Sequence, residues 1–193
     1  MSEIIYRGKV VTLRLDPVPL EDGRTVKLEI VEHAPSIGVL ALKDDETALL
    51  VRQYRRSAGY PLGEVLLEIV AGSLDPGEAP EAAAQRELAE EIGYRAREMD
   101  SLGGFYLCPG YTTEFMHIFL ARGLEAATAE ADEDEQIELE EISVAELYRQ
   151  ARAGELRDSK TVAALLLAEG HLFHQGDTKT QRGAAENLQG WTG

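Results

Sequence analysis

Three glutamates near the middle of the sequence have the spacing of a metal-binding helix face. Glu87, Glu90 and Glu91 are three and four residues apart, so on an α-helix their carboxylates share one face, where they repel one another unless a cation lies between them. Mg²⁺ prefers carboxylate oxygens and often shares its coordination with a substrate phosphate. The adjacent Arg86 can hold a carboxylate through a forked hydrogen bond. This spacing indicates metal-dependent phosphate chemistry or, alternatively, the solvated face of an alanine-rich helix.

The segments around these glutamates favour a loop followed by a helix. Residues 81–92 are rich in Ala, Glu, Gln and Leu, which are good helix formers. Pro80 suits the first helical turn, and Gly93 suits the end of the helix. Gly72 and Gly77 bracket a tight loop before the helix, in which backbone carbonyls can face the same ion.

This loop and helix resemble the signature of the Nudix hydrolases, G-x5-E-x7-R-E-U-x-E-E-x-G-U, in which U is a bulky aliphatic residue. The fixed positions of the signature are filled by Gly72, Glu78, Arg86, Glu87, Glu90, Glu91 and Gly93. Tyr94 departs from the last aliphatic position. Because that position serves packing, the departure weakens the resemblance little.

The resemblance implies hydrolysis of a diphosphate by attack of water at phosphorus, assisted by two or three metal ions. It implies that Glu87 and Glu91 are the main ligands of Mg²⁺, with Mn²⁺ or another divalent ion as an alternative. Glu90 would contribute directly or through water, and the carbonyl of Ala71 would complete the set. Arg86 would belong to the catalytic site by tying the loop to the helix, together with Glu78.

Residues outside the signature resemble the ADP-ribose pyrophosphatase branch of this family. Pro109 lies sixteen residues after Gly93, as in that branch, although a Pro-Gly pair also marks an ordinary turn. Arg52 and Arg55, the candidate substrate-binding arginines, resemble a pair in that branch of which the second, here Arg55, contacts the diphosphate or the terminal ribose. Both arginines can equally be charges at a strand edge that discourage aggregation. Glu114 matches an acid that contacts the substrate, and alone it would be interpreted as a loop acid.

An acidic segment supplies a candidate catalytic base. Nine acidic residues and no basic residue lie between positions 123 and 142. In the branch that this sequence resembles, a glutamate from a mobile loop moves toward the metals and acts as base or positions the water. Glu135 fits that role best and Glu133 second, whereas a solvated loop is the alternative for both. Such a carboxylate does not need a raised pKa, because a bound ion already acidifies the water.

Composition narrows the class of protein. The 193 residues carry 19 basic and 35 acidic side chains, a net charge of −16. Such a surface repels phosphate backbones, so we expect no nucleic-acid partner. No apolar run approaches the ~20 residues of a membrane helix, so we expect no membrane partner. Cys108 is the single cysteine, which excludes an internal disulfide and favours a cytoplasmic location.

The remaining pattern predicts a mixed α/β (α+β) fold. Alternating apolar and polar residues predict strands, and Pro17 and Pro19 mark a turn between the first two of them. The expected strands cover residues 4–15, 25–31, 37–42, 48–53, 65–70, 102–106, 114–121 and 137–142. Residues 144–153 and 159–169 read as amphipathic helices. We therefore expect a Nudix α/β/α sandwich with a mixed sheet, and a small N-terminal antiparallel β unit.

The domain prediction is an N-terminal β unit (1–45), a Nudix hydrolase domain (46–173) and a flexible tail (174–193). The resemblance implies that the N-terminal unit forms a homodimer and supplies part of the adenine-binding wall, with Tyr6 and Arg24 as candidates. The expected reaction is cleavage of ADP-ribose to AMP and ribose 5-phosphate. GDP-mannose or another nucleotide sugar or dinucleotide is the alternative substrate. An alternative of another class is a catalytically silent ligand-sensing module, against which the complete carboxylate set argues.

Overall fold

The computed structural model describes residues 2–128 and 137–173. Glu133, Glu135 and the predicted tail 174–193 therefore lie outside the described residues. In chain order the elements are β1 (Glu3–Arg7), β2 (Thr12–Pro19), β3 (Thr25–Glu32), β4 (Ser36–Leu42), β5 (Thr47–Arg55), β6 (Glu64–Glu68), β7 (Val70–Ser73), α1 (Pro80–Ile92), β8 (Tyr94–Tyr106), β9 (Phe115–Ala126), β10 (Ile137–Ser143), α2 (Val144–Ala153) and α3 (Ser159–Phe173).

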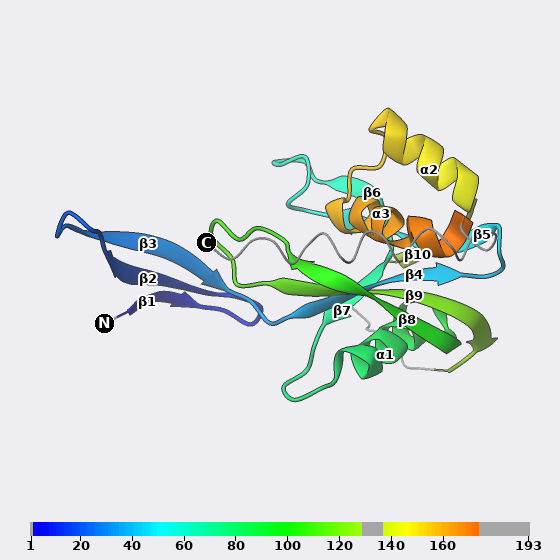
Figure 1. The fold of residues 1–193 in the computed structure, drawn as a ribbon, viewed down its shortest axis with the longest axis horizontal. Coiled ribbons are helices and arrows are strands. Elements are labelled where there is room, and N and C mark those ends of the chain that lie inside the picture. The colour runs from blue at the N-terminus through cyan, green and yellow to red at the C-terminus, as the bar shows by residue number, and fades with distance from the viewer. Residues whose placement is uncertain (1, 129–136, 174–193) are drawn as a thin grey trace, which may run out of the picture.

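The larger sheet is mixed and lies between two helical layers. Its order is β10-β5-β4-β9-β8, with β6 paired to β5 and β7 paired to β4. The β4–β9 pair is parallel, whereas β4 pairs antiparallel with β5 and with β7. Figure 1 shows α1 below this sheet and α2 and α3 above it. The predicted α/β/α sandwich with a mixed sheet is confirmed.

Alternating residues of the central strands build two cores. Leu40 and Leu50 pack with α2 and α3, whereas Val39 and Leu49 pack with α1. Successive side chains of a strand point to opposite faces, and the continuous apolar sequence of β4 and β5 therefore supplies both cores. All four of these side chains are at most 1% exposed. The two cores fix α1 and α3 on opposite faces of the same strands.

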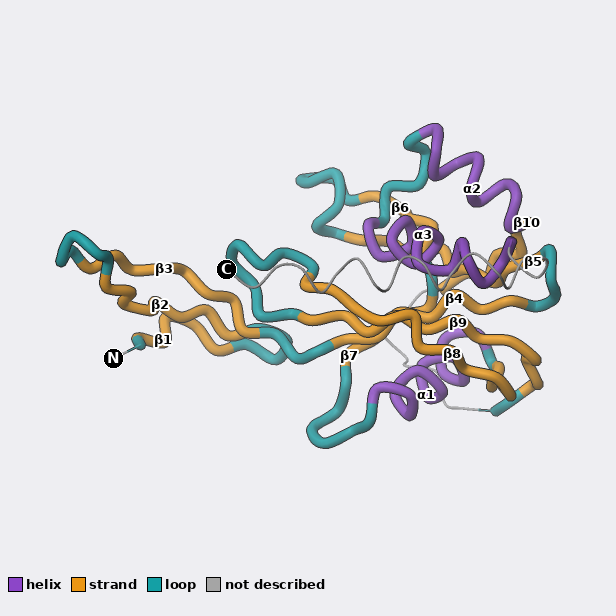
Figure 2. Tube along the Cα trace, viewed as in Figure 1, coloured by secondary structure: helices purple, strands orange, loops and turns teal. Residues whose placement is uncertain are grey.

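A separate three-stranded antiparallel sheet, β1-β2-β3, forms an arm that extends from the body (Figures 1 and 2). Hydrogen bonds join its last strand to the body: Val31 N–H donates to the Tyr111 carbonyl at 2.7 Å, and Thr113 N–H donates to the Val31 carbonyl at 3.0 Å. The arm ends at Glu32, ahead of the expected boundary at residue 45. The reason is that β4 pairs within the larger sheet.

The predicted turn at Pro17 and Pro19 is wrong, because both prolines lie inside β2 and pair with β3. β1 pairs with β2 only between Thr12 and Leu15. Beyond that point β2 has an open edge, where a residue without an N–H donor breaks no ladder hydrogen bond. The predicted single strand at 4–15 is also wrong, since a turn after Arg7 divides it into β1 and β2.

Candidate active site

A cavity of about 810 Å³ lies where the arm, the larger sheet, α1 and α3 meet. Both signs of charge line it, and its neutral lining includes Ala71 and Gly72 of β7 and Ile137 of β10. Its charged or titratable lining residues are Lys9, His33, Arg55, Asp75, Arg86, Glu87, Glu90, Glu91, Glu114 and Lys160. The cavity thus unites residues that lie far apart in the sequence.

Helix α1 contributes the acidic wall. Glu87, Glu90 and Glu91 all line the cavity, as their shared helix face requires. Leu88, on another face, is fully buried against the sheet and anchors the helix. Gly93 ends the helix in the left-handed region, with φ of 72°, and its N–H donates to the Leu88 carbonyl. The predicted helix and its end are confirmed.

Arg86 organises this acidic wall. Its Nη1 donates to Glu87 Oε1 at 2.8 Å and to Glu90 Oε2 at 2.9 Å. Its Nε and Nη2 donate to Glu78, both at 3.0 Å, and Nη2 also donates to the Ser73 carbonyl. The hydrogen bonds that Arg86 donates to Glu78, followed by those to Glu87 and Glu90, raise the pKa of Arg86 against the opposing effect of burial. Arg86 therefore ties the loop to the helix and holds two carboxylates.

Strand β7 approaches α1 closely at Gly72. A Cβ atom on Gly72 would lie 1.8 Å from Glu87 Oε1 and 2.1 Å from its Cδ. Only a residue without a side chain therefore lets the Ala71–Gly72 backbone and the Glu87 carboxylate share this space. The close approach places a backbone segment beside the acidic wall.

The donor set fits a hard divalent cation, because it combines carboxylates with a neighbouring backbone segment. Glu87, Glu90, Glu91 and Ala71 line one cavity, and Gly72 leaves room beside Glu87. Within residues 2–128 and 137–173, no three His, Cys, Asp or Glu side chains are gathered closely enough to hold an ion as they stand. Glu87 and Glu90 are instead turned to Arg86. Bringing the carboxylates together would thus require small side-chain rotations.

Replacing Gly72 with alanine should disturb this arrangement with little effect on the fold. The new methyl group would displace the end of the flexible Glu87 side chain rather than backbone. We expect kcat to fall by about 10–100-fold, the scale of losing support for a metal ligand, and the Mg²⁺ concentration for half-maximal activity to rise. Gly110→Ala is the control, since a Cβ there meets nothing within 4 Å. Equal activity of the two variants would contradict the prediction.

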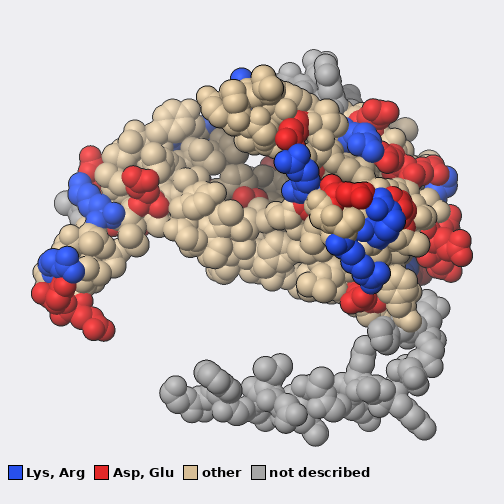
Figure 3. All heavy atoms as spheres, turned by 90° about the horizontal axis from the view of Figure 1, so that it is seen from above, with Lys and Arg blue, Asp and Glu red and all other residues tan. Residues whose placement is uncertain are grey.

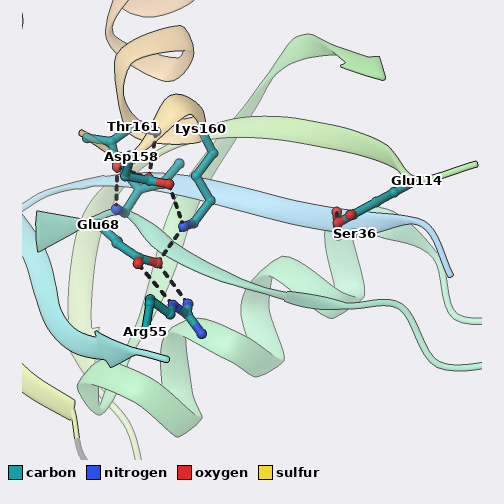
Figure 4. A network of polar contacts seen from close by, with 8 residues as sticks. Ser36, Arg55, Glu68, Glu114, Asp158, Lys160 and Thr161 are labelled. Carbon is teal, nitrogen blue, oxygen red and sulfur yellow. Dashed lines mark hydrogen bonds and ion pairs between the residues drawn. The ribbon is translucent and has the colours of Figure 1, made fainter. Parts of the chain in front are cut away.

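Two cations that line the cavity, Arg55 and Lys160, hold a buried carboxylate between them (Figure 4). Glu68, the last residue of β6, is 1% exposed. Arg55 donates to both of its oxygens, through Nε at 2.9 Å and Nη2 at 2.8 Å, and Lys160 of α3 donates to Oε2. Burial raises the pKa of Glu68, but the Arg55 hydrogen bonds and the Lys160 charge outweigh it, so the pKa is lowered. Glu68 is therefore a carboxylate at neutral pH.

The lowered pKa of Glu68 predicts an acid-dependent loss of stability. A carboxyl group whose pKa is lower in the folded than in the unfolded state contributes its full stabilisation above the unfolded-state pKa of about 4.3. This contribution is lost as the pH falls through the folded-state pKa. Glu68→Gln should lower the free energy of unfolding by about 3 kcal/mol at pH 7, the lower end for a buried pair, and flatten its decline below about pH 4.3. Urea unfolding at several pH values measures both. An unchanged pH dependence in this variant would contradict the prediction.

A third cluster lies near the arm. Ser36 Oγ donates to Glu114 Oε1 at 2.8 Å, and His33 Nδ1 lies 3.8 Å from the same oxygen. Figure 4 shows Ser36 and Glu114 facing each other, away from the Glu68 network. His33 Nδ1 also donates to the Ala34 carbonyl at 2.6 Å. The predicted substrate-contacting acid, Glu114, thus lines the cavity with a fixed orientation.

Two predicted substrate residues lie elsewhere. Arg52 forms an ion pair with Glu140 of β10 and does not line the cavity. It is three positions from Arg55, and residues an odd number apart on a strand point to opposite faces. β5 is paired on both sides at Arg52, with β10 and with β6, so the strand-edge interpretation of Arg52 is not supported. Pro109 is exposed and does not line the cavity either.

Sequence reasoning missed Lys160, His33 and Lys9, which all line the cavity. Lys160 begins a helix whose amphipathic pattern indicates packing and carries no signal of a site. Lys9 lies in the connection between β1 and β2, whereas the candidates Tyr6 and Arg24 of the arm are not among the lining residues. Only the folded chain brings these positions to the acidic wall.

Comparisons with known proteins agree with this geometry. Residues 32–165 match the NUDIX domain family. An ADP-ribose pyrophosphatase of Bacillus subtilis (strain 168) is 38% identical over 166 residues, covering 85% of this chain and 88% of that protein. A GDP-mannose pyrophosphatase of Cronobacter sakazakii is 35% identical over 154 residues, covering 75% and 80%.

The fold has a counterpart among solved structures. A crystal structure described as an ADP compounds hydrolase superposes with a TM-score of 0.80 at 24% identity, covering 91% of this chain and 94% of the other. The chain belongs to the NUDIX domain family. It is a Nudix hydrolase related to the ADP-ribose pyrophosphatases, and enzymes of this kind require a divalent metal ion. No described helix is long and apolar enough to span a membrane.

Proposed function

We propose that this enzyme hydrolyses the diphosphate of nucleoside diphosphate sugars and that its substrate is ADP-ribose, which it converts to AMP and ribose 5-phosphate. The observation that carries the proposal is the combination of carboxylates and cations in one cavity. Glu87, Glu90 and Glu91 line this cavity together with Arg55 and Lys160. A diphosphate in this cavity can contact Arg55 as well as a metal ion held by the carboxylates.

The proposed cofactor is Mg²⁺, with Mn²⁺ as an alternative, held by Glu87, Glu90, Glu91 and the Ala71 carbonyl. When bound, this cofactor polarises the phosphoryl oxygens and activates the attacking water. Arg86 holds the carboxylates Glu87 and Glu90 in place. These residues thus supply the catalytic wall of the cavity.

The remaining residues bind the substrate or accept the proton of the attacking water. Arg55 supplies hydrogen-bond donors that match a phosphate, and Glu114 accepts from a hydroxyl of the terminal ribose. Arg52 and Pro109 lie outside the cavity wall, so we assign them no contact with the substrate within the same chain. We propose Glu135 as the base that takes the proton of the attacking water, with Glu133 second. Ile137, two positions after Glu135 in the sequence, lines the cavity, which supports this proposal.

A substrate panel tests the proposed activity. Purified enzyme with Mg²⁺ is offered ADP-ribose, GDP-mannose, NADH and diadenosine polyphosphates, and the products are separated by chromatography. We expect ADP-ribose to have the highest kcat/KM and AMP and ribose 5-phosphate to be the products. If ADP-ribose is cleaved more slowly than the other compounds, the proposed substrate is wrong.

GDP-mannose is the second candidate substrate. The relative named as a GDP-mannose pyrophosphatase covers three quarters of this chain, and the walls that contact a diphosphate do not distinguish one nucleoside from another. Faster cleavage of GDP-mannose than of ADP-ribose would favour this candidate. A catalytically silent sensing module is disfavoured, because the complete carboxylate set lines the cavity.

We propose a homodimer formed through the arm. Ile4, Ile5, Tyr6, Val10 and Leu28 of the arm are 46–65% exposed, an unusual concentration of apolar surface for a small sheet. Figure 3 shows charged residues mainly at the tip of the arm, with an uncharged stretch behind it. Light scattering after size-exclusion chromatography should give twice the chain mass of 21.2 kDa, and Ile5→Glu should lower the measured mass toward that of one chain.

We also propose a cytoplasmic location, which the single cysteine, Cys108, supports.

A further inference from the structure

Glu68 is the centre of a network that the proposed reaction does not explain. An isolated buried carboxylate is strongly disfavoured, yet Glu68 lies at the end of β6 with 1% exposure. Arg55 forms a two-pronged contact with both of its oxygens. This fork fixes the plane of the Arg55 guanidinium, because two parallel hydrogen bonds leave little rotation. Glu68 therefore determines how Arg55 faces the cavity.

Lys160 contacts the same carboxylate from the opposite side and is itself held in place. Its Nζ donates to Asp158 Oδ1 at 2.9 Å as well as to Glu68, and its side chain is 12% exposed. Asp158 Oδ2 accepts from Thr161 N–H at 3.0 Å. Ile69 N–H, next to Glu68 in sequence, donates to Thr161 Oγ1 at 2.9 Å. The first turn of α3 is thus fastened to the strand segment that carries Glu68.

The charges of this network balance. Arg55 and Lys160 are positive, and Glu68 and Asp158 are negative, so the four groups have no net charge. Without Lys160, the unit would carry one net negative charge beside the space assigned to the diphosphate. Arg55 would then be the only described cation in direct contact with Glu68 and would be drawn more firmly to it. Both effects oppose binding of a phosphate group.

We propose that Lys160, acting through Glu68, is a positioning residue that orients Arg55 for the substrate diphosphate, so that the first turn of α3 controls substrate affinity. This inference rests on the proposed function, in which Arg55 binds the diphosphate. It assigns Lys160 no contact with the substrate.

The first test compares Lys160→Met and Lys160→Arg with the wild-type enzyme. Lys160→Met should raise KM for ADP-ribose by about tenfold, the loss of one charge-assisted interaction, while kcat changes by less than about threefold. Lys160→Arg should restore most of the affinity, because it restores the charge. Arg157→Met is the matched control: Arg157, two residues before α3, pairs with Glu64 of β6 at 2.7 Å, but at the surface. An unchanged KM in Lys160→Met, or a loss confined to kcat, would overturn the proposal.

A double-mutant cycle separates positioning from direct contact. If Lys160 acts through Arg55, adding Lys160→Met to Arg55→Met should leave KM unchanged, since the oriented group is already gone. Fully additive effects would mean that Lys160 contacts the substrate itself and would overturn the inference. Thermal unfolding of each variant shows whether its fold is retained.

Binding without turnover distinguishes this inference from the proposed function. Calorimetry with ADP-ribose and with GDP-mannose, in the absence of divalent ions, measures Kd for wild type and Lys160→Met. A wild-type enzyme that binds ADP-ribose without cleaving it when Mg²⁺ is added would contradict the proposed function. The Kd of Lys160→Met divided by the Kd of the wild type, for the same nucleotide sugar, would still test the positioning role. A ratio near ten supports that role, and a ratio near one overturns it.

Discussion

Replacing Glu91 with glutamine is expected to lower kcat by about 10³-fold or more and to leave the melting temperature within about 4 °C of the wild-type value. The amide keeps the shape of the side chain but loses the negative charge, and a hard divalent cation binds a neutral amide oxygen more weakly than a carboxylate. Glu91 lines the cavity from the last turn of α1. Steady-state kinetics over a range of Mg²⁺ concentrations measures the loss.

Glu81→Gln is the control for this substitution. Glu81 lies in the first turn of the same helix, is exposed and does not line the cavity. Glu81→Gln removes one negative charge from α1, as Glu91→Gln does, and we expect this variant to keep full activity. Unaltered turnover in Glu91→Gln would mean that the metal assignment is wrong and would favour the silent sensing module.

Replacing Arg86 with methionine should reduce both activity and stability. Glu78, Glu87 and Glu90 would lose a shared cation and repel one another. Because Arg86 is 30% exposed, we expect a loss of about 2 kcal/mol, less than for a fully buried pair, and a fall in melting temperature of about 4–8 °C. We expect kcat to fall by at least about 10²-fold, because two proposed metal ligands lose their support.

The effect of Mg²⁺ on the melting temperature makes the Arg86 prediction specific. A divalent cation replaces part of the missing positive charge, so added Mg²⁺ should raise the melting temperature of Arg86→Met more than that of the wild type. Arg149→Met is the control, since Arg149 contacts Glu146 and Glu155 but lies on the exposed surface of α2. The same fall in melting temperature in both variants would contradict the argument.

The acidic wall was predictable because it is local. Helix geometry alone places Glu87, Glu90 and Glu91 on one face, and the glycine at position 93 ends the helix in the left-handed region, as expected. The sequence signature includes a glycine at position 72, but it does not show why glycine is needed there. The close approach of Glu87, fifteen positions later in the sequence, appears only when β7 and α1 are packed.

The arginines of β5 show where the sequence pattern was insufficient. Arg52 and Arg55 were both candidates for substrate binding, but the alternation of the strand directs only Arg55 to the cavity, and Arg52 pairs with Glu140 instead. The turn predicted at Pro17 and Pro19 of β2 was wrong for a related reason. Whether a proline breaks a strand depends on whether its edge has a neighbour, and the short β1 leaves that edge open.

The sequence by itself determined the chemistry of this protein: a helix with three carboxylates and an arginine, which depends on contacts within a few residues. Only the tertiary structure decided what faces that helix. Lys160 and Glu68 are 92 residues apart, and their meeting depends on the packing of α3 over the sheet. A lysine at the start of a helix has no local pattern that marks it, because its role comes from the buried carboxylate that the fold brings to it.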